Sequence, residues 1–136
     1  MPRYAGQTFR PYSVAQHCLL VAELLPKMRL YALIHDAQEA LLCDIPTPAK
    51  EAMRALGSTA YDELEWRLYK AVCRKVGLEE RAPIVIKIAD VESRILESAA
   101  LRRKSPRIPK VLKPILSLPD GGRVAWLDAV REEMKP

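Results

Sequence analysis

Prolines and glycines divide this chain into segments whose apolar residues recur at the spacing of a helix. In the first of these segments, Val14, Cys18, Val21 and Leu25 are spaced three or four positions apart, as on one face of a helix. Ser13 can cap this first helix, and Pro26 can end it. Aromatic residues make up only 6% of the chain, whereas alanine, leucine and the long charged residues that favour helices are frequent. The sequence therefore predicts an all-α helical bundle rather than a sandwich or a barrel.

The expected helices are separated by turns that carry proline or glycine. Two prolines in residues 44–48 oppose regular structure there, and four prolines make residues 105–122 mostly irregular. Thr59 and Asp62 have the spacing of a capping box at the start of the third helix, and Gly77 can end it. The helices expected from these signals cover, approximately, residues 13–25, 28–43, 59–76, 82–103 and 124–134.

Apolar faces on the second, third and fourth helices are expected to complete the core of one compact domain. A length of 136 residues suits a single domain, with its core in about residues 3–103 and an irregular, proline-rich C-terminal extension in residues 104–136. The residues on these faces are Leu30, Leu33, Ala37, Ala40 and Leu41 in the second helix, Leu64, Leu68, Ala71 and Val72 in the third, and Ile84, Ile88, Val91, Ile95 and Ala99 in the fourth.

Charge and cysteine usage narrow the class of protein. The net charge is +5, but only residues 101–113 are locally basic, and a solvated surface is the more common explanation of such a run. Nucleic acid is therefore not the expected partner, although a positive field would also attract phosphorylated metabolites. The three cysteines show no close pairing, the N-terminus does not resemble a signal peptide, and no apolar stretch is long enough to cross a membrane. These features predict a cytoplasmic protein with reduced thiols and no membrane partner.

The two histidines of the chain lie at informative positions. His17 is at the edge of the apolar face of the first helix, and His35 is followed at once by Asp36 on the second. Asp90 interrupts residues 84–91, the most apolar stretch of the chain. A buried carboxylate needs a cation or hydrogen-bond donors to offset its desolvation. A divalent metal ion bound by two neutral imidazoles and two carboxylates would provide that compensation.

Each of these residues has a simpler explanation when it is taken alone. A single histidine on an apolar face is more often a hydrogen-bonded core residue than a metal ligand. Asp90 could instead pair with Lys87 or Arg94, which are three positions before it and four after it on the same helix. The combination of His, His-Asp and Asp on three helices favours a metal site, because helical bundles build such sites from facing helices.

The sequence around these residues resembles the HD-domain superfamily of metal-dependent phosphohydrolases, and within it the small YfbR-like nucleotidases. The resemblance covers roughly residues 3–101 and implies an HD-type helical bundle. The matching segments are YSVAQH at 12–17, HDAQEA at 35–40, DIPTPAK at 44–50 and IAD at 88–90.

The resemblance implies a metal centre and a catalytic acid–base group. The family's four ligands hold one divalent ion (Co²⁺, Mn²⁺ or Mg²⁺), which orients the phosphate and acidifies a water molecule. Glu39 matches the family's catalytic glutamate, which handles protons at the attacking water or the leaving group. Asp44 matches an acidic residue that faces the same water or the sugar. The residues that correspond to the four ligands are His17, His35, Asp36 and Asp90.

The resemblance also implies how a nucleotide is held. Lys50 and Arg3 occupy places where relatives contact phosphate, and Tyr4 falls where they place an aromatic ring against the sugar or base. Lys87 lies one helical turn before Asp90 and should project near the ion. Relatives often form homodimers, so a homo-oligomer is expected.

Three functions follow from the sequence as alternatives. The leading one is hydrolysis of a (deoxy)nucleoside 5′-monophosphate to nucleoside and phosphate. The second is release of triphosphate from a dNTP, because Arg3, Lys50 and Lys87 would suit a longer phosphate tail. The third is a non-catalytic module that binds a nucleotide or nucleic acid through residues 102–113.

Overall fold

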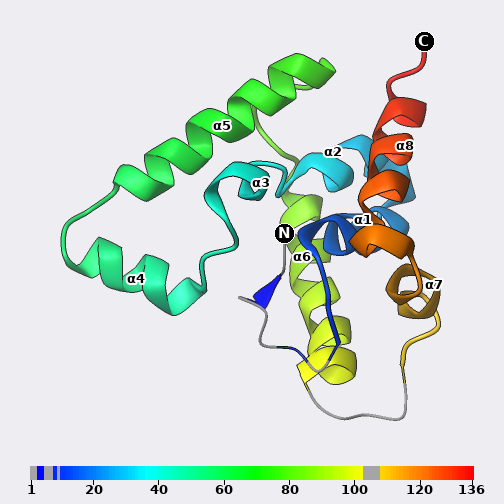
Figure 1. Cartoon of the computed structure of the whole chain (residues 1–136). Helices are drawn as coiled ribbons and strands as arrows, with labels where there is room; N and C mark the ends of the chain where they lie inside the picture. Colours follow the sequence, from blue (N-terminus) through cyan, green and yellow to red (C-terminus); the bar gives the residue numbers. More distant parts are fainter. Residues whose placement is uncertain (1–2, 5–7, 9, 103–107) are drawn as a thin grey trace.

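The computed structural model describes residues 3–4, 8, 10–102 and 108–136, and the regular elements in them are helices (Figure 1). The described residues contain no β-strand, so the all-α prediction is confirmed. Short 3-10 turns at Pro26–Met28 and Pro119–Gly122 and a π-helical turn at Ser98–Arg102 accompany the α-helices. The α-helices are α1 (Val14–Leu24), α2 (Arg29–Ile34), α3 (Glu39–Leu42), α4 (Thr47–Ala55), α5 (Ala60–Val76), α6 (Ile84–Glu97), α7 (Leu112–Leu116) and α8 (Arg123–Glu133).

Helix α1 lies at the centre of the body and packs against α2, α6, α7 and α8. Ser13 caps it as predicted, because the Ser13 hydroxyl accepts from the Gln16 backbone N–H and the Gln16 side chain accepts from the Ser13 backbone N–H, both at 3.0 Å. Most of α1 is buried, including His17. The sequence therefore places a histidine on the helix that is most enclosed by the others.

The expected second helix is interrupted. Helix α2 ends at Ile34, and tight turns with hydrogen bonds between residues three apart, such as Ala37 N to Ile34 O at 3.0 Å, lead into α3. The prediction that Ala40 and Leu41 point inward was wrong, since both are exposed and Leu41 is 74% exposed. The interruption rotates α3 away from the core, so its apolar residues no longer continue the buried face of α2.

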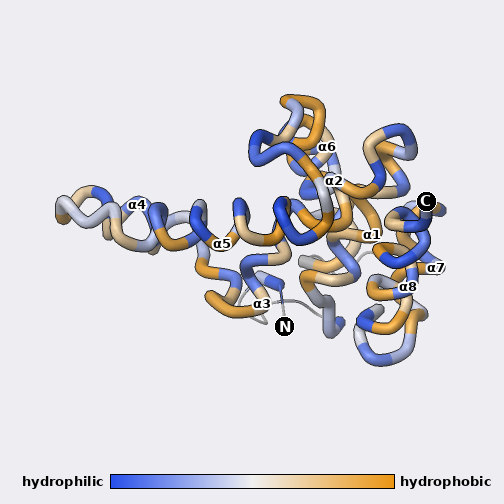
Figure 2. Tube along the Cα trace, turned by 90° about the horizontal axis from the view of Figure 1, so that it is seen from above, coloured by the Kyte–Doolittle hydropathy of each residue, from blue (hydrophilic) through white to orange (hydrophobic). Residues whose placement is uncertain are grey.

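Helices α4 and α5 form an arm that projects from one side of the body (Figures 1 and 2). Helix α4 was not predicted: it begins at Thr47, and its Pro48 is tolerated because N–H groups in the first helical turn have no helical partner. Helix α5 ends as expected at Gly77, which is left-handed with φ 75°. Thr59, however, makes no side-chain cap, and Asp62 instead accepts from the Arg54 guanidinium at 2.6 and 2.7 Å.

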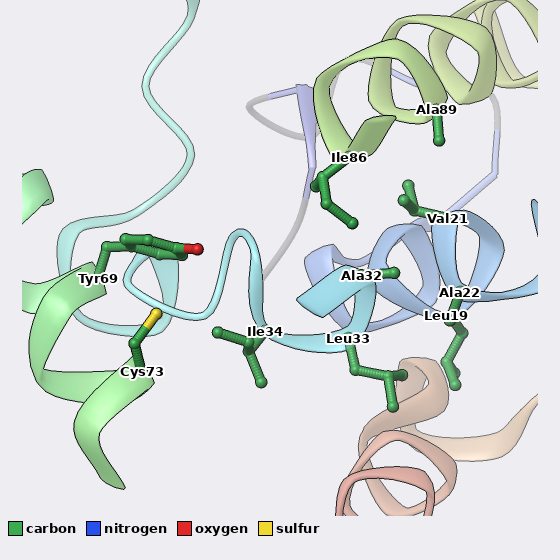
Figure 3. Close-up of a cluster of buried hydrophobic side chains, with 10 residues drawn as sticks. All are labelled: Leu19, Val21, Ala22, Ala32, Leu33, Ile34, Tyr69, Cys73, Ile86 and Ala89. Atoms are coloured by element: carbon green, nitrogen blue, oxygen red, sulfur yellow. The ribbon is translucent and has the colours of Figure 1, made fainter. Parts of the chain in front are cut away.

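Tyr69 and Cys73 of α5 help to join the arm to the body. They are the buried residues of α5, and they belong to a cluster with side chains of α1, α2 and α6 (Figure 3). The expected apolar face of α5 was wrong at Leu64 and Ala71, which are exposed. The residues of α5 that are buried lie in its second half, whereas its first half contacts α4 through charged side chains such as Asp62 and Glu65.

Helix α6 packs with the face opposite to the one expected. Ile84, Ile88, Val91 and Ile95 are 74%, 60%, 48% and 67% exposed, so their assignment to the core was wrong. The buried face of α6 instead contains Ile86, Ala89, Asp90, Ser93 and Glu97. Small side chains on this face allow α6 to approach α1 closely, and that contact brings the polar side chains of α6 toward His17.

The C-terminal segment packs onto the body and contains more helix than its prolines suggested. Leu112 and Ile115 of α7 are buried, and α8 lies against α1 and α2. The indole N–H of Trp126 on α8 donates to the Leu33 carbonyl at 2.6 Å. Residues 103–107, which include part of the basic run, lie outside the described residues. Among the helices that are described, none combines the length and apolarity needed to cross a membrane.

Candidate metal centre and its cavity

The two histidine rings meet through their Nε2 atoms, which are 3.1 Å apart. The other nitrogen of each ring is already engaged: His35 Nδ1 lies 2.7 Å from the Ala32 carbonyl, and His17 Nδ1 lies 2.6 Å from Glu97 Oε1. Carbonyl and carboxylate oxygens can only accept, so each Nδ1 carries a hydrogen. In the neutral rings, both Nε2 atoms are therefore lone-pair donors that face each other.

Two carboxylate oxygens complete this cluster. Asp36 Oδ2 lies 3.4 Å from His17 Nε2 and 3.2 Å from His35 Nε2, and Asp90 Oδ1 lies 3.2 Å from His17 Nε2. One ligand atom from each of the four residues lies within 4.8 Å of every other. Ligands about 2.0–2.2 Å from one ion are about 3.0–3.5 Å apart at neighbouring coordination positions. The structure thus brings the four predicted ligands together in a cluster that could hold a metal ion.

The charges in the cluster favour a cation. Burial lowers the pKa of His17, but the carboxylates of Asp36, Asp90 and Glu97 raise it to about 10. Burial raises the pKa of Asp90, but nearby His17 and Arg94 lower it to about 2. Asp90 Oδ1 is buried and has no hydrogen-bond partner among the described residues. A divalent ion fits beside this ionised acceptor, and as it binds it must displace the Nε2 protons, so that both imidazoles become lone-pair donors.

Glu97 contacts the cluster through His17, and the sequence patterns did not point to it. It is the last residue of α6, is fully buried, and accepts hydrogen bonds from four side chains. The donors and their distances are Arg3 Nε at 3.2 Å, Tyr4 Oη at 2.5 Å, Tyr12 Oη at 3.0 Å and His17 Nδ1 at 2.6 Å. A glutamate on an amphipathic helix usually looks like a solvated residue. The available signal was its position seven residues after Asp90, on the same helix face.

We expect Glu97→Gln to weaken metal binding about 10- to 100-fold, the usual effect of losing a carboxylate that orients a ligand histidine. Glutamine can still accept from His17, but its NH₂ group would oppose the Arg3, Tyr4 or Tyr12 donors. Calorimetric titration with Co²⁺ or Mn²⁺ measures the effect. Glu92→Gln, at an exposed position on the same helix, is the matched control. An unchanged affinity in folded Glu97→Gln would show that Glu97 does not orient His17 for a metal.

Glu39 and Asp44 both lie beside the cluster. Glu39 begins α3, is 5% exposed, and its Oε2 atom is buried without a hydrogen-bond partner among the described residues. Burial, together with the nearby carboxylates of Asp36 and Asp44, raises the pKa of Glu39 to about 8. Asp44 Oδ2 accepts from the Tyr4 backbone N–H at 2.6 Å. Glu39 is thus the acidic group whose proton is easiest to exchange near neutral pH.

Three cations surround the two carboxylates of the cluster. Arg3 is buried, with Nη1 3.4 Å from Asp36 Oδ2 and Nη2 3.7 Å from Asp90 Oδ1. Lys87 is largely exposed, and its Nζ atom lies 3.8 Å from Asp90 Oδ2. Arg94 lies closer, with Nη2 2.6 Å from the same oxygen. The alternative ion pair considered for Asp90 therefore forms through Oδ2, while Oδ1 faces the histidines.

Lys50 and Tyr4 are the remaining residues that were predicted to contact the substrate. Both line a cavity that lies beside the cluster. Lys50 Nζ is 2.8 Å from Glu65 Oε1 and lies over the Tyr61 ring, 5.2 Å from its centroid. The Tyr4 side chain donates to Glu97. Lys50 therefore reaches the cavity as part of an ion pair, and Tyr4 is held at its wall.

The cavity beside the cluster has a volume of about 900 Å³. The cluster residues His35, Asp36 and Asp90 line it together with residues of the N-terminal segment, the turn before α4, the start of α4, α5 and α6. Trp66 also lines the cavity, although no sequence motif includes this residue. Its position among charged residues of an amphipathic helix was the one available signal. A cavity of this size is typical of sites for small ligands.

Comparison with known proteins places the chain beside proteins that have no described activity. No family model matches the chain. An uncharacterized protein of Rhodobacter capsulatus is 43% identical over 110 residues, which cover 71% of this chain and 54% of that protein. The uncharacterized protein YfdR of Escherichia coli is 36% identical over 90 residues, which cover 65% of this chain and 48% of YfdR. The chain thus spans about half the length of these curated relatives.

Proposed function

We propose that the chain is an HD-type, metal-dependent phosphohydrolase that acts on a nucleotide phosphoester. The preferred substrate is a (deoxy)nucleoside 5′-monophosphate, and the products are a nucleoside and phosphate. One observation carries the proposal: two imidazole Nε2 atoms and two carboxylate oxygens converge at the wall of a cavity, with Glu39 beside them. Helical bundles build metal sites from side chains on facing helices, and a bound metal ion beside an acid–base group can support hydrolysis.

The side chains of the cluster have separate roles in this proposal. His17, His35, Asp36 and Asp90 would hold one divalent ion, with Co²⁺, Mn²⁺ and Mg²⁺ as candidates. When bound, such an ion polarises a phosphoryl oxygen and lowers the pKa of a water molecule. The second nitrogen of each imidazole is already fixed by a hydrogen bond, so the rings need not reorient when a substrate arrives.

Glu39 would manage the proton during hydrolysis. In its ionised form Glu39 accepts a proton from water as the water oxygen bonds to phosphorus. The bond between phosphorus and the nucleoside 5′ oxygen breaks, and Glu39 returns the proton to that oxygen. A pKa raised to about 8 suits this exchange, because both forms of the carboxyl group are then accessible near neutral pH.

We expect Lys50→Ala to lower kcat/KM for a dNTP about tenfold, and to lower it much less for the matching dNMP. A triphosphate tail is long enough to draw Lys50 away from Glu65, whereas a monophosphate can be satisfied by the metal and one of the cations near Asp90. Lys75→Ala, at an exposed position near the end of α5, is the control. Equal small effects on both substrates would mean that Lys50 makes no contact with phosphate.

Release of triphosphate from dNTPs is the alternative activity, and a non-catalytic binding module is the alternative class. The basic run invoked for that module includes Arg103, Lys104 and Arg107, which lie outside the described residues. One experiment separates the three: purified protein is incubated with dNMPs, NMPs and dNTPs, with Co²⁺, Mn²⁺, Mg²⁺ or a chelator. The proposal requires inorganic phosphate from monophosphates and no turnover in chelator. Triphosphate release supports the alternative activity, and nucleotide binding without any turnover supports the module.

We also propose a cytoplasmic homo-oligomer. The cysteines Cys18, Cys43 and Cys73 are unpaired, which suits a reducing compartment. The exposed apolar stripe of α6, defined by Ile84, Ile88, Val91 and Ile95, offers a surface through which copies of the chain could associate.

A further inference from the structure

The side chains that line the cavity beside the cluster are of two chemical kinds. One group is charged and includes Asp36, Asp90 and the cations around Asp90. The other group is mainly apolar and includes Trp66 and Tyr69 of α5 with Ile84, Ile86 and the preceding Pro83. A nucleotide also combines two kinds of surface, a charged phosphate and a flat heterocycle. Metal ligands and cations account for the charged group only.

Trp66 offers a stacking surface within the apolar group of lining residues. Its ring lies on the Tyr69 ring, with centroids 5.7 Å apart and planes inclined by 19°. Tyr69 is buried and packs in the cluster that joins α5 to the body, so it fixes the Trp66 ring from behind. Trp66 itself is 48% exposed, which leaves about half of a large aromatic side chain in water. Such a surface gains free energy when another aromatic ring covers it.

The Trp66 indole N–H and the Gln38 side chain have hydrogen-bonding capacity that the described residues leave unused. Within the described residues, the Trp66 indole N–H has no hydrogen-bond partner, in contrast to the N–H of Trp126. Gln38 lines the same cavity, is only 7% exposed, and its Oε1 atom has no partner there either. The Lys70 ammonium lies 5.6 Å from the centroid of the Trp66 ring, on a flexible side chain that can move aside.

We propose that Trp66 is the stacking platform for the heterocyclic base of the substrate, backed by Tyr69 and flanked by the aliphatic wall at the start of α6. The assignment rests on the proposed function insofar as the phosphate occupies the metal end of the same cavity. It makes the substrate class a nucleotide rather than a simple sugar phosphate. Stacking on an indole tolerates any base, so this contact selects for the presence of a base and not for its identity.

A kinetic comparison tests the platform through substrates with and without a base. Trp66→Ala should raise KM for dAMP about tenfold with little change in kcat, and should change kcat/KM for 2-deoxyribose 5-phosphate much less. Trp66→Phe should retain much of the preference for dAMP. Leu64→Ala, at a half-exposed position of the same helix outside the cavity, is the matched control. Equal losses on both substrates in Trp66→Ala, or no loss on either, would overturn the proposal.

A binding measurement keeps the platform testable apart from the phosphohydrolase activity. Deoxyadenosine has a base but no phosphate, so it can stack on Trp66 whether or not the protein hydrolyses phosphoesters. We expect saturable quenching of tryptophan fluorescence by deoxyadenosine, absent in Trp66→Phe, and none with 2-deoxyribose 5-phosphate. Quenching without phosphate release from any nucleotide would refute the proposed function and keep the platform. Phosphate release without quenching would keep the proposed function and refute the platform.

Discussion

Replacing Asp90 by alanine should abolish metal binding and activity together. Asp90 provides the one cluster oxygen that is buried without a hydrogen-bond partner in the described part of the chain, and it faces His17 Nε2 at 3.2 Å. Without it, three ligands remain and the negative charge of the cluster falls by one. We expect the affinity for Co²⁺ or Mn²⁺ to fall by more than about 100-fold. This exceeds the effect of losing a residue, such as Glu97, that only orients a ligand. Titration calorimetry measures the affinity and the number of ions per chain.

The same substitution leaves Arg94 without its partner, so folding must be checked independently. Circular dichroism of Asp90→Ala should retain the helical spectrum of the wild type. Asp128→Ala removes an exposed carboxylate from α8 and should leave both metal binding and turnover unchanged. If folded Asp90→Ala binds one ion per chain with wild-type affinity, the cluster is not the metal centre.

Glu39→Ala should separate the chemistry from metal binding. We expect turnover to fall by about 10²-fold or more, which is typical for the loss of a general acid or base. Metal affinity should stay near the wild-type value, because Glu39 is not one of the four cluster residues. Initial rates of phosphate release at saturating dNMP, together with calorimetry on the same preparation, measure both quantities.

The control for Glu39→Ala is Glu51→Ala, which removes an exposed carboxylate from α4. Near-normal turnover in Glu39→Ala would remove this residue from the mechanism. A parallel loss of metal affinity and turnover would instead give Glu39 a role in holding the ion.

The sequence predicted the residues of the cluster better than the surfaces around them. His17, His35, Asp36 and Asp90 are local to three recognisable segments, so their side chains could be chosen before their arrangement was known. The termination of α5 at Gly77 and the capping of α1 by Ser13 are equally local, and both were predicted. What these features share is that a few adjacent residues determine them.

Features that depend on contacts between distant segments were missed. Apolar periodicity indicates that α6 has two unlike faces, but it assigned Ile84, Ile88 and Ile95 to the core. The buried face of α6 instead carries Asp90 and Glu97, because the partners of these carboxylates come from α1 and from the N-terminal residues. Periodicity ranks residues by hydropathy and contains no information about such partners.

The hydrogen bonds at Glu97 have a consequence for the order in which the molecule assembles. They join Glu97 to residues that lie 80 to 94 positions earlier in the chain. Closing loops of this length costs entropy before any contact is gained, and contacts of high sequence separation slow folding. Individual helices can form without these contacts, but the cluster cannot. An ion that binds the cluster would therefore stabilise only the fully collapsed chain, and metal-dependent protection against unfolding would report on complete tertiary assembly rather than on helix content.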